Sequence, residues 1–93
     1  GITDNQQNIW FVGQNQPNPA TSTSIIPYNI PIADEVTLKI LSINGQILYQ
    51  EILQAVSGKN EIVINTDFLA NGIYYYSMEY QGKTIVKKMS VQK

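Results

Sequence analysis

The chain has 93 residues, which is enough for one domain with a modest hydrophobic core. Hydrophobic residues make up 43% of the sequence, charged residues 14%, and the formal net charge is -1, so we expect neither disorder nor charge-driven binding to nucleic acid. Cys, His and Arg are absent, which excludes disulfides and removes the commonest zinc ligand, general base and phosphate clamp. No segment approaches the ~20 apolar residues of a membrane-spanning helix. We therefore expect no enzymatic activity, metal site, cofactor or transmembrane segment.

The composition favours strands, because Ile and Val number 20 against five Leu and β-branched side chains pack well in sheets. Residues 2–8 are polar and are interpreted as the end of a linker, followed by a short first strand at residues 9–12. Two prolines predict an extended turn at residues 14–19. Residues 24–30 alternate as a strand that contains Pro27. We expect this strand at a sheet edge, or with its proline nitrogen facing a side without ladder hydrogen bonds.

A hairpin is predicted in the middle of the chain. Residues 36–40 alternate and lead into Asn44 and Gly45, a pair that tolerates the positive φ angles of a type I′ turn. The return segment, residues 46–53, also has apolar residues at helical spacing. We interpret it as a strand, because the hairpin turn requires a partner and no capping residue opens a helix. Residues 57–60 are expected to turn the chain again.

The remaining segments complete an all-β fold. We expect a short strand at residues 62–64, a crossover at 67–71, a long aromatic strand at 72–80, a turn at 81–82 and a closing strand at 83–91. Seven short strands with turns at this spacing predict a seven-stranded immunoglobulin-like antiparallel β-sandwich.

The crossover has the form of a tyrosine corner, in which a tyrosine early in a strand bonds back to the backbone a few residues upstream. Leu69 is expected to fill the core and Gly72 to permit the tight turn. We predict that Tyr74 is buried, with its hydroxyl bonded to backbone near Ala70.

Six short motifs occur in a fixed order, and together they resemble the C-terminal sorting domain of type IX secretion. They are Gln-Asn-x-Pro-Asn-Pro-Ala at 14–20, Ile-x-Tyr-x-Ile-Pro at 26–31, Val-x-Leu-x-Ile with Asn-Gly-Gln at 36–46, Gly-Lys-Asn at 58–60, Leu-x-x-Gly-x-Tyr at 69–74 and Gly-Lys-x-x-x-Lys-Lys-Met at 82–89. The resemblance implies that residues 1–13 hold the linker end and first strand, and that residues 14–93 form the sorting domain. The motif residues to which it gives a structural role are Pro17, Asn18, Pro19, Asn44, Gly45, Leu69, Gly72 and Tyr74.

The resemblance also implies a function. A covalently linked N-terminal cargo domain would pass through the periplasm, and the outer-membrane type IX translocon would export the whole protein to the cell surface or the extracellular space. A sortase-like surface peptidase commonly cleaves such a domain and attaches the cargo. The domain itself would be a passive substrate of both machines.

Charge is distributed unevenly along the chain. Residues 1–82 carry two lysines and all seven acidic residues, whereas residues 83–93 carry four lysines and no acidic residue. These four lysines are candidate contacts with the secretion machinery, acting on capture rate and register. The alternative is that they protect a terminal strand from pairing with other sheets. The lysines are Lys83, Lys87, Lys88 and Lys93.

Other functions are weighed on fewer residues. Asp34 and Glu35 form an adjacent acidic pair that lacks the further oxygen ligands of a calcium site, so we interpret them as a solvated loop. Alternation leaves Tyr75 outside while its tyrosine neighbours turn inward, and one exposed aromatic ring makes a poor sugar-binding platform. An extracellular adhesion or spacer module remains the alternative function, and a glycan-binding module the third.

Overall fold

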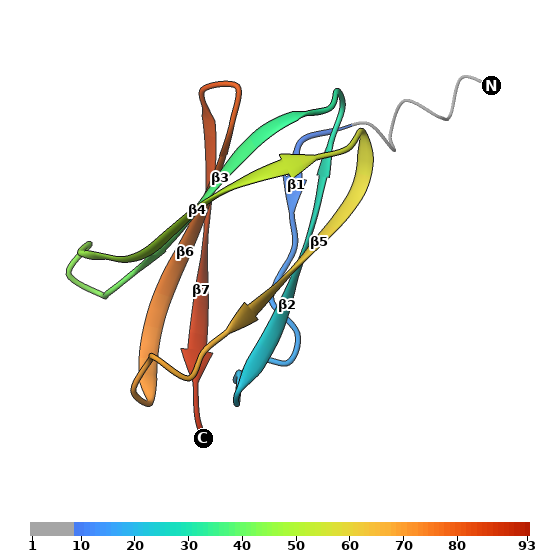
Figure 1. The fold of residues 1–93 in the computed structure, drawn as a ribbon. Coiled ribbons are helices and arrows are strands. Elements are labelled where there is room, and N and C mark those ends of the chain that lie inside the picture. The colour runs from blue at the N-terminus through green and yellow to red at the C-terminus, as the bar shows by residue number, and fades with distance from the viewer. Residues whose placement is uncertain (1–8) are drawn as a thin grey trace.

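The computed structural model describes residues 9–93, which form seven strands in two antiparallel sheets (Figure 1). The linker end expected at residues 2–8 lies outside the described residues. Within residues 9–93 no helix is long and apolar enough to cross a membrane. The strands are β1 (Phe11–Val12), β2 (Thr23–Ile30), β3 (Asp34–Leu41), β4 (Ile47–Ala55), β5 (Gly58–Asn65), β6 (Gly72–Tyr80) and β7 (Lys83–Val91).

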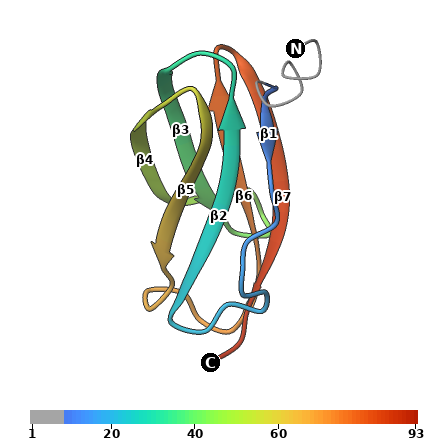
Figure 2. The ribbon, with the colours of Figure 1, turned by 90° about the vertical axis from the view of Figure 1, so that its right-hand side faces the viewer.

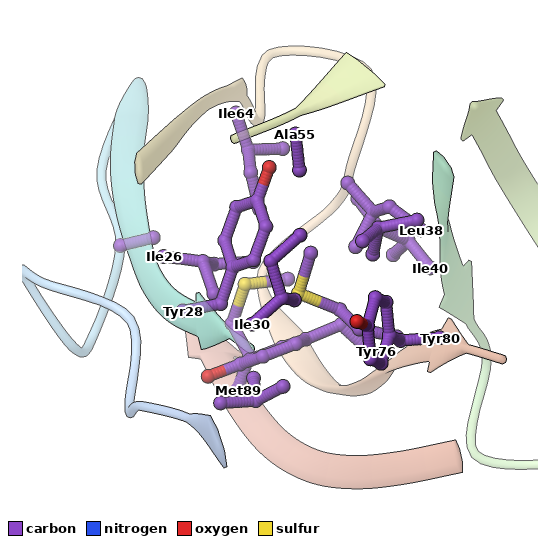
Figure 3. Close-up of a cluster of buried hydrophobic side chains, with 14 of the residues drawn as sticks. Ile26, Tyr28, Ile30, Leu38, Ile40, Ala55, Ile64, Tyr76, Tyr80 and Met89 are labelled. Atoms are coloured by element: carbon purple, nitrogen blue, oxygen red, sulfur yellow. The ribbon is translucent and has the colours of Figure 1, made fainter. Parts of the chain in front are cut away.

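The two sheets pack face to face. One has the strand order β1-β2-β5 and the other the order β4-β3-β6-β7 (Figures 1 and 2). Alternation in each strand sends every second side chain inward, and fully burying one aliphatic side chain contributes about 1.5–3 kcal/mol. Figure 3 shows side chains from both sheets meeting in the core. The core includes Ile26, Tyr28, Ile30, Val36, Leu38, Ile40, Ile64, Tyr76, Met78, Tyr80, Met89 and Val91.

Pro27 lies in the central strand of its sheet, so the expected edge position is wrong. Its nitrogen faces the side on which the pairing of β2 with β1 has ended, and one backbone hydrogen bond remains on that side. The Gly13 N–H donates to Pro27 O at 2.8 Å, where the pairing of β1 with β2 has ended. Pro27 has no N–H to donate to the Gly13 carbonyl. That carbonyl accepts instead from the Tyr76 hydroxyl at 2.7 Å. A Cβ on Gly13 would lie 2.7 Å from Pro27 Cγ, so a side chain at this position would collide with the proline ring.

The type I′ turn expected at Asn44 and Gly45 is wrong. Gly45 has φ 86°, but Asn44 has no positive φ. The hairpin has a longer loop, in which Ser42 O accepts from Gly45 N at 2.9 Å and Ser42 N donates to Gln46 O at 2.9 Å. These bonds and the register shift between Ile40 and Leu41 accommodate the loop with one left-handed residue.

The last hairpin has the backbone that was expected in the central one. Gln81 and Gly82 both have positive φ, at 50° and 78°. Tyr80 and Lys83 pair directly across this two-residue turn, as a type I′ geometry requires. The positions of both hairpins were therefore predicted correctly. The type I′ turn was predicted for the central hairpin, but it occurs in the last one.

Several strand boundaries differ from expectation, and the first strand begins at Phe11 rather than at residue 9. The return segment is a strand, but it runs to Ala55, because it stays paired with β3 as far as Asp34. Residues 57–60 were expected to be a turn, yet Gly58 already begins β5 by pairing with Ile30. The acidic pair at residues 34–35 forms the exposed start of β3 rather than a loop.

Candidate functional site

The segment 14–20 joins the two sheets, because it bonds to β2 of one sheet and to β7 of the other. Gln16 exchanges two backbone hydrogen bonds with Ile25 of β2, at 2.8 and 2.7 Å. Ala20 donates to Ser90 O at 2.8 Å and accepts from Gln92 N at 2.9 Å. We call this contact of residues 14–20 with residues 88–92 the seam. Figure 2 shows the segment between β1 and β2 running beside β7.

The Pro-Asn-Pro-Ala part of the motif has a structural explanation in the seam. Asn18 Oδ1 accepts from both the backbone N of Ser90 at 3.1 Å and its Oγ at 3.0 Å. The flanking Pro17 and Pro19 have no N–H and each fixes its own φ. Both follow cis peptide bonds, and residues 17–19 bend between the bridges at Gln16 and Ala20, so the extended turn expected here is wrong. Ala20 is completely buried against β7, where its small side chain permits the close approach of the two backbones.

Tyr76 of β6 holds the beginning of this segment. Its hydroxyl donates to Gly13 O at 2.7 Å and accepts from Asn15 N at 2.9 Å. The Asn15 amide is itself buried and donates to Pro17 O at 3.1 Å and Ser24 Oγ at 3.0 Å. Burial raises the pKa of Tyr76 to about 12, so its phenol keeps the proton that it donates even in moderately alkaline solution.

The tyrosine corner is present, with one difference from expectation. The Tyr74 hydroxyl donates to Ala70 O at 2.7 Å, as predicted. Its side chain is only partly buried, however, and packs against the edge of the core. Leu69 is buried beneath the corner, and Gly72 has φ 154°, a backbone region that is essentially restricted to glycine.

Lys93 closes the same crossover from the end of the chain. Its ammonium donates to Leu69 O at 2.6 Å and to Asp67 O at 3.1 Å. Its backbone N donates to Asn71 Oδ1 at 2.9 Å. The ammonium group of Lys93 is therefore bound to backbone carbonyls of the crossover.

The structure does not gather the four candidate lysines on one face. Lys83 lies beside the β6–β7 turn, and about 30 Å of extended chain separates it from Lys93. Lys87 shares the inward side of β7 with Met89 and is half-buried, whereas Lys88 is exposed on the outer side. Of the two central lysines, only Lys88 therefore lies on the outer face of the sheet.

Sequence reasoning did not identify the apolar surroundings of Lys88. On the outer face of the sheet, Tyr75 pairs with Lys88 across β6 and β7, Ile73 pairs with Ser90, and Val86 lies two residues before Lys88. Tyr75 is 36% exposed, Ile73 44% and Val86 55%. We call Ile73, Tyr75, Val86 and Lys88 the outer patch. Alternation placed Ile73 and Tyr75 outside, but only the strand pairing brings them beside the lysine.

The acidic pair makes local contacts. Asp34 accepts from Glu35 N at 2.7 Å and from Gln81 Nε2 at 3.2 Å, and these hydrogen bonds lower the pKa of Asp34, with the backbone bond first. Glu35 accepts from Gln54 at 3.2 Å. Among residues 9–93, no three carboxylates, His or Cys are grouped as a metal site would need.

A glycan platform would need at least two coplanar exposed aromatic rings. Tyr49 and Phe68 are both exposed and their ring centroids are 5.8 Å apart, but the ring planes are inclined by 40°. Tyr49 also donates its hydroxyl to Glu51 at 2.6 Å. This pair therefore lacks the coplanar geometry on which a sugar ring stacks.

The comparison with protein families identifies what these motifs have in common. The family model of the secretion system C-terminal sorting domain matches residues 16–92, which include most of the first side of the seam and all of the second. The chain belongs to this family, and its function is that of a C-terminal sorting signal for type IX secretion. Such a signal directs proteins to the cell surface or the extracellular space. A comparison with curated proteins gave no match.

Proposed function

We propose that the secretion machinery recognises the folded sandwich rather than a linear peptide, and that the outer patch with Lys88 at its centre is the contact. The observation that supports this most is the seam. Asn18 and Ser90 are 72 residues apart in sequence, yet they are joined by two hydrogen bonds. A signal whose two ends depend on each other in this way is complete only in the folded domain.

The motif residues contribute mainly to shape. Asn18, Leu69 and Tyr74 have their polar or apolar groups occupied by contacts within the chain. Their role in this proposal is to position the surface that the machinery contacts. This leaves the exposed side chains of the outer patch to bind a partner.

Lys88 is the lysine best placed for such a contact. The ammonium of Lys93 is bound to carbonyls, and Lys87 lies half-buried on the inward side. The backbone carbonyl of Lys88 accepts from Gln14 Nε2 at 2.7 Å, which fixes the strand on which its side chain stands. An exposed cation beside apolar side chains suits an acidic partner surface with an apolar border, and its charge would act on capture rate.

We further propose that the two sheets form an immunoglobulin-like sandwich. The strand orders β1-β2-β5 and β4-β3-β6-β7, with a tyrosine corner at the start of β6, are consistent with that class. In this proposal residues 14–93, together with the first strand, fold as one sorting domain and residues 1–13 contain the end of the linker.

The proposed route begins in the periplasm, where the domain folds at the C-terminus of a cargo protein. The type IX translocon then binds the outer patch and exports the cargo, and a sortase-like surface peptidase cleaves the domain and attaches the cargo to the cell surface. The domain is a passive substrate throughout, without enzymatic activity, metal or cofactor. An adhesion or spacer role would take its place if the domain exports no cargo.

The contact can be tested by reversing one charge at a time in a reporter fusion. Lys88→Glu should lower surface display of a periplasm-directed reporter, because it replaces the cation of the outer patch with an anion. The matched control is Lys59→Glu on the exposed side of β5, in the other sheet. Both variants should keep the stability of the parent domain within about 0.5 kcal/mol. If Lys88→Glu folds and exports as well as Lys59→Glu, Lys88 is not a contact with the machinery and only protects the strand from pairing.

A further inference from the structure

The strand β4 forms one edge of the four-stranded sheet. It runs over nine residues, and no other strand within residues 9–93 pairs with its outer side. Natural sheets usually protect such an edge with lysine, proline or a covering segment, because an open edge can pair with another chain. The sequence Ile-Leu-Tyr-Gln-Glu-Ile-Leu-Gln-Ala contains neither lysine nor proline, and Glu51 is its one charged residue.

The other edges carry such protection. β7 has three lysines within the strand and is covered by the seam along its C-terminal half. β5 has Lys59 and Glu61 on its exposed side. β1 is only two residues long. The difference marks β4 as the edge that is suited to accept a strand.

The sequence of β4 shows what kind of strand fits. Residues 47–53 read Ile-Leu-Tyr-Gln-Glu-Ile-Leu, which is nearly symmetric about Gln50. A two-fold axis at Gln50 places Leu48 opposite an isoleucine and Ile52 opposite a leucine. Ile52 is 58% exposed and Leu48 37%, so both side chains are available to a partner on the outer face.

We propose that β4 pairs antiparallel with β4 of a second copy of this chain, with Gln50 opposite Gln50, so that two four-stranded sheets become one continuous sheet. In this register Tyr49 lies opposite Glu51 of the second copy. Its hydroxyl already donates to Glu51 of its own chain at 2.6 Å, so the same two groups can bond across the pair. The register centred on Glu51 would place two carboxylates directly opposite each other, which is destabilising.

Single cysteines test this register, because the chain has no natural cysteine. Gln50→Cys should form an intermolecular disulfide under mild oxidation, since the two residues face each other at the short Cα separation that a disulfide requires. Ile52→Cys alone should not, because the two copies of this position are offset by about 13 Å along the strands. A mixture of Leu48→Cys and Ile52→Cys chains should cross-link to each other.

Sedimentation velocity of the unmodified domain supplies the second measurement. The parent should show a concentration-dependent dimer, and Gln50→Lys should remove it by opposing two ammonium groups at the axis. Gln54→Lys, on the same outer face but outside the paired segment, should leave the dimer intact. Circular dichroism confirms that each variant is folded. Equal cross-linking at residues 50 and 52, no cross-linking at 50, or a dimer that survives Gln50→Lys would each overturn the proposal.

Discussion

Tyr76 joins parts of the chain that are far apart in sequence through one buried hydroxyl. Tyr76→Phe leaves the Gly13 carbonyl and the Asn15 N–H without their partner, so we expect a loss of about 1–3 kcal/mol in the free energy of unfolding. Tyr74→Phe removes a single bond from a partly exposed side chain and should cost about 1 kcal/mol. Urea unfolding measures both, with Tyr75→Phe as an exposed control. Equal losses of stability in the three variants would contradict the larger role assigned to the buried hydroxyl of Tyr76.

The raised pKa of Tyr76 predicts a specific loss of stability in alkali. The folded-state pKa is about 12, above the ordinary value of 10.0, because burial disfavours the phenolate. The contribution of protonated Tyr76 to the free energy of unfolding is therefore complete below pH 10. It is lost between about pH 10 and 12, at up to about 1.4 kcal/mol per pH unit.

Comparison with Tyr76→Phe separates the titration of Tyr76 from that of the lysines and the other tyrosines. The stability difference between the wild-type domain and Tyr76→Phe should be constant up to about pH 10 and should narrow above it. Urea unfolding curves at a series of pH values measure the difference. A gap that stays constant up to pH 12 would show that Tyr76 does not titrate as its burial implies.

The two tyrosines also show what single residues reveal before a structure is known. Tyr74 follows a local motif and bonds four residues away, so its partner could be predicted. Tyr76 bonds to residues more than 60 positions away, and alternation could assign it only to the core. Asn15 likewise belonged to a motif, but its burial depends on the meeting of two sheets.

At the scale of elements, the seam makes β7 depend on the segment 14–20. Asn18→Ala removes two hydrogen bonds to Ser90, and we expect a loss of about 1 kcal/mol together with faster amide exchange at Ser90. Asn44→Ala, in the exposed loop of the central hairpin, is the matched control and should change stability by about 0.5 kcal/mol or less. Unchanged exchange at Ser90 would show that Asn18 does not hold the strand.

This dependence also limits what deletion of the last strand can show. Removing residues 89–93 takes away Met89 and Val91, which are buried in the core, as well as the Ser90 side of the seam. Such a deletion would impair export by unfolding the domain, whatever the machinery contacts. Substitution of exposed side chains on an intact strand separates the two causes.

The elements were mostly predictable because their signals are local. Alternation and turn residues predicted seven strands and both hairpins, including β4 despite its helical spacing. The turn types were not predictable, since the geometry at Gly45 depends on the register of β3 and β4. The position of Pro27 in a central strand depends on Gly13 and Tyr76, which no neighbouring residue specifies.

For the whole molecule, the sequence predicted the all-β class and the family, whereas the order of strands in each sheet required the structure. The separation of the four lysines is an example. They are close in sequence, but alternation and the length of β7 place them on different faces and at opposite ends. The outer patch arises from the pairing of β6 with β7, which a linear motif does not contain.

Export of a reporter tests the central claim most directly. Residues 1–93 are fused to the C-terminus of a periplasm-directed reporter in a host with type IX secretion, and the reporter exposed at the surface or released to the medium is measured by protease accessibility and assay. The same reporter without the domain provides the baseline. We predict that the fusion leaves the periplasm and that the unfused reporter stays there. A fusion that is folded and stable but remains in the periplasm would contradict it.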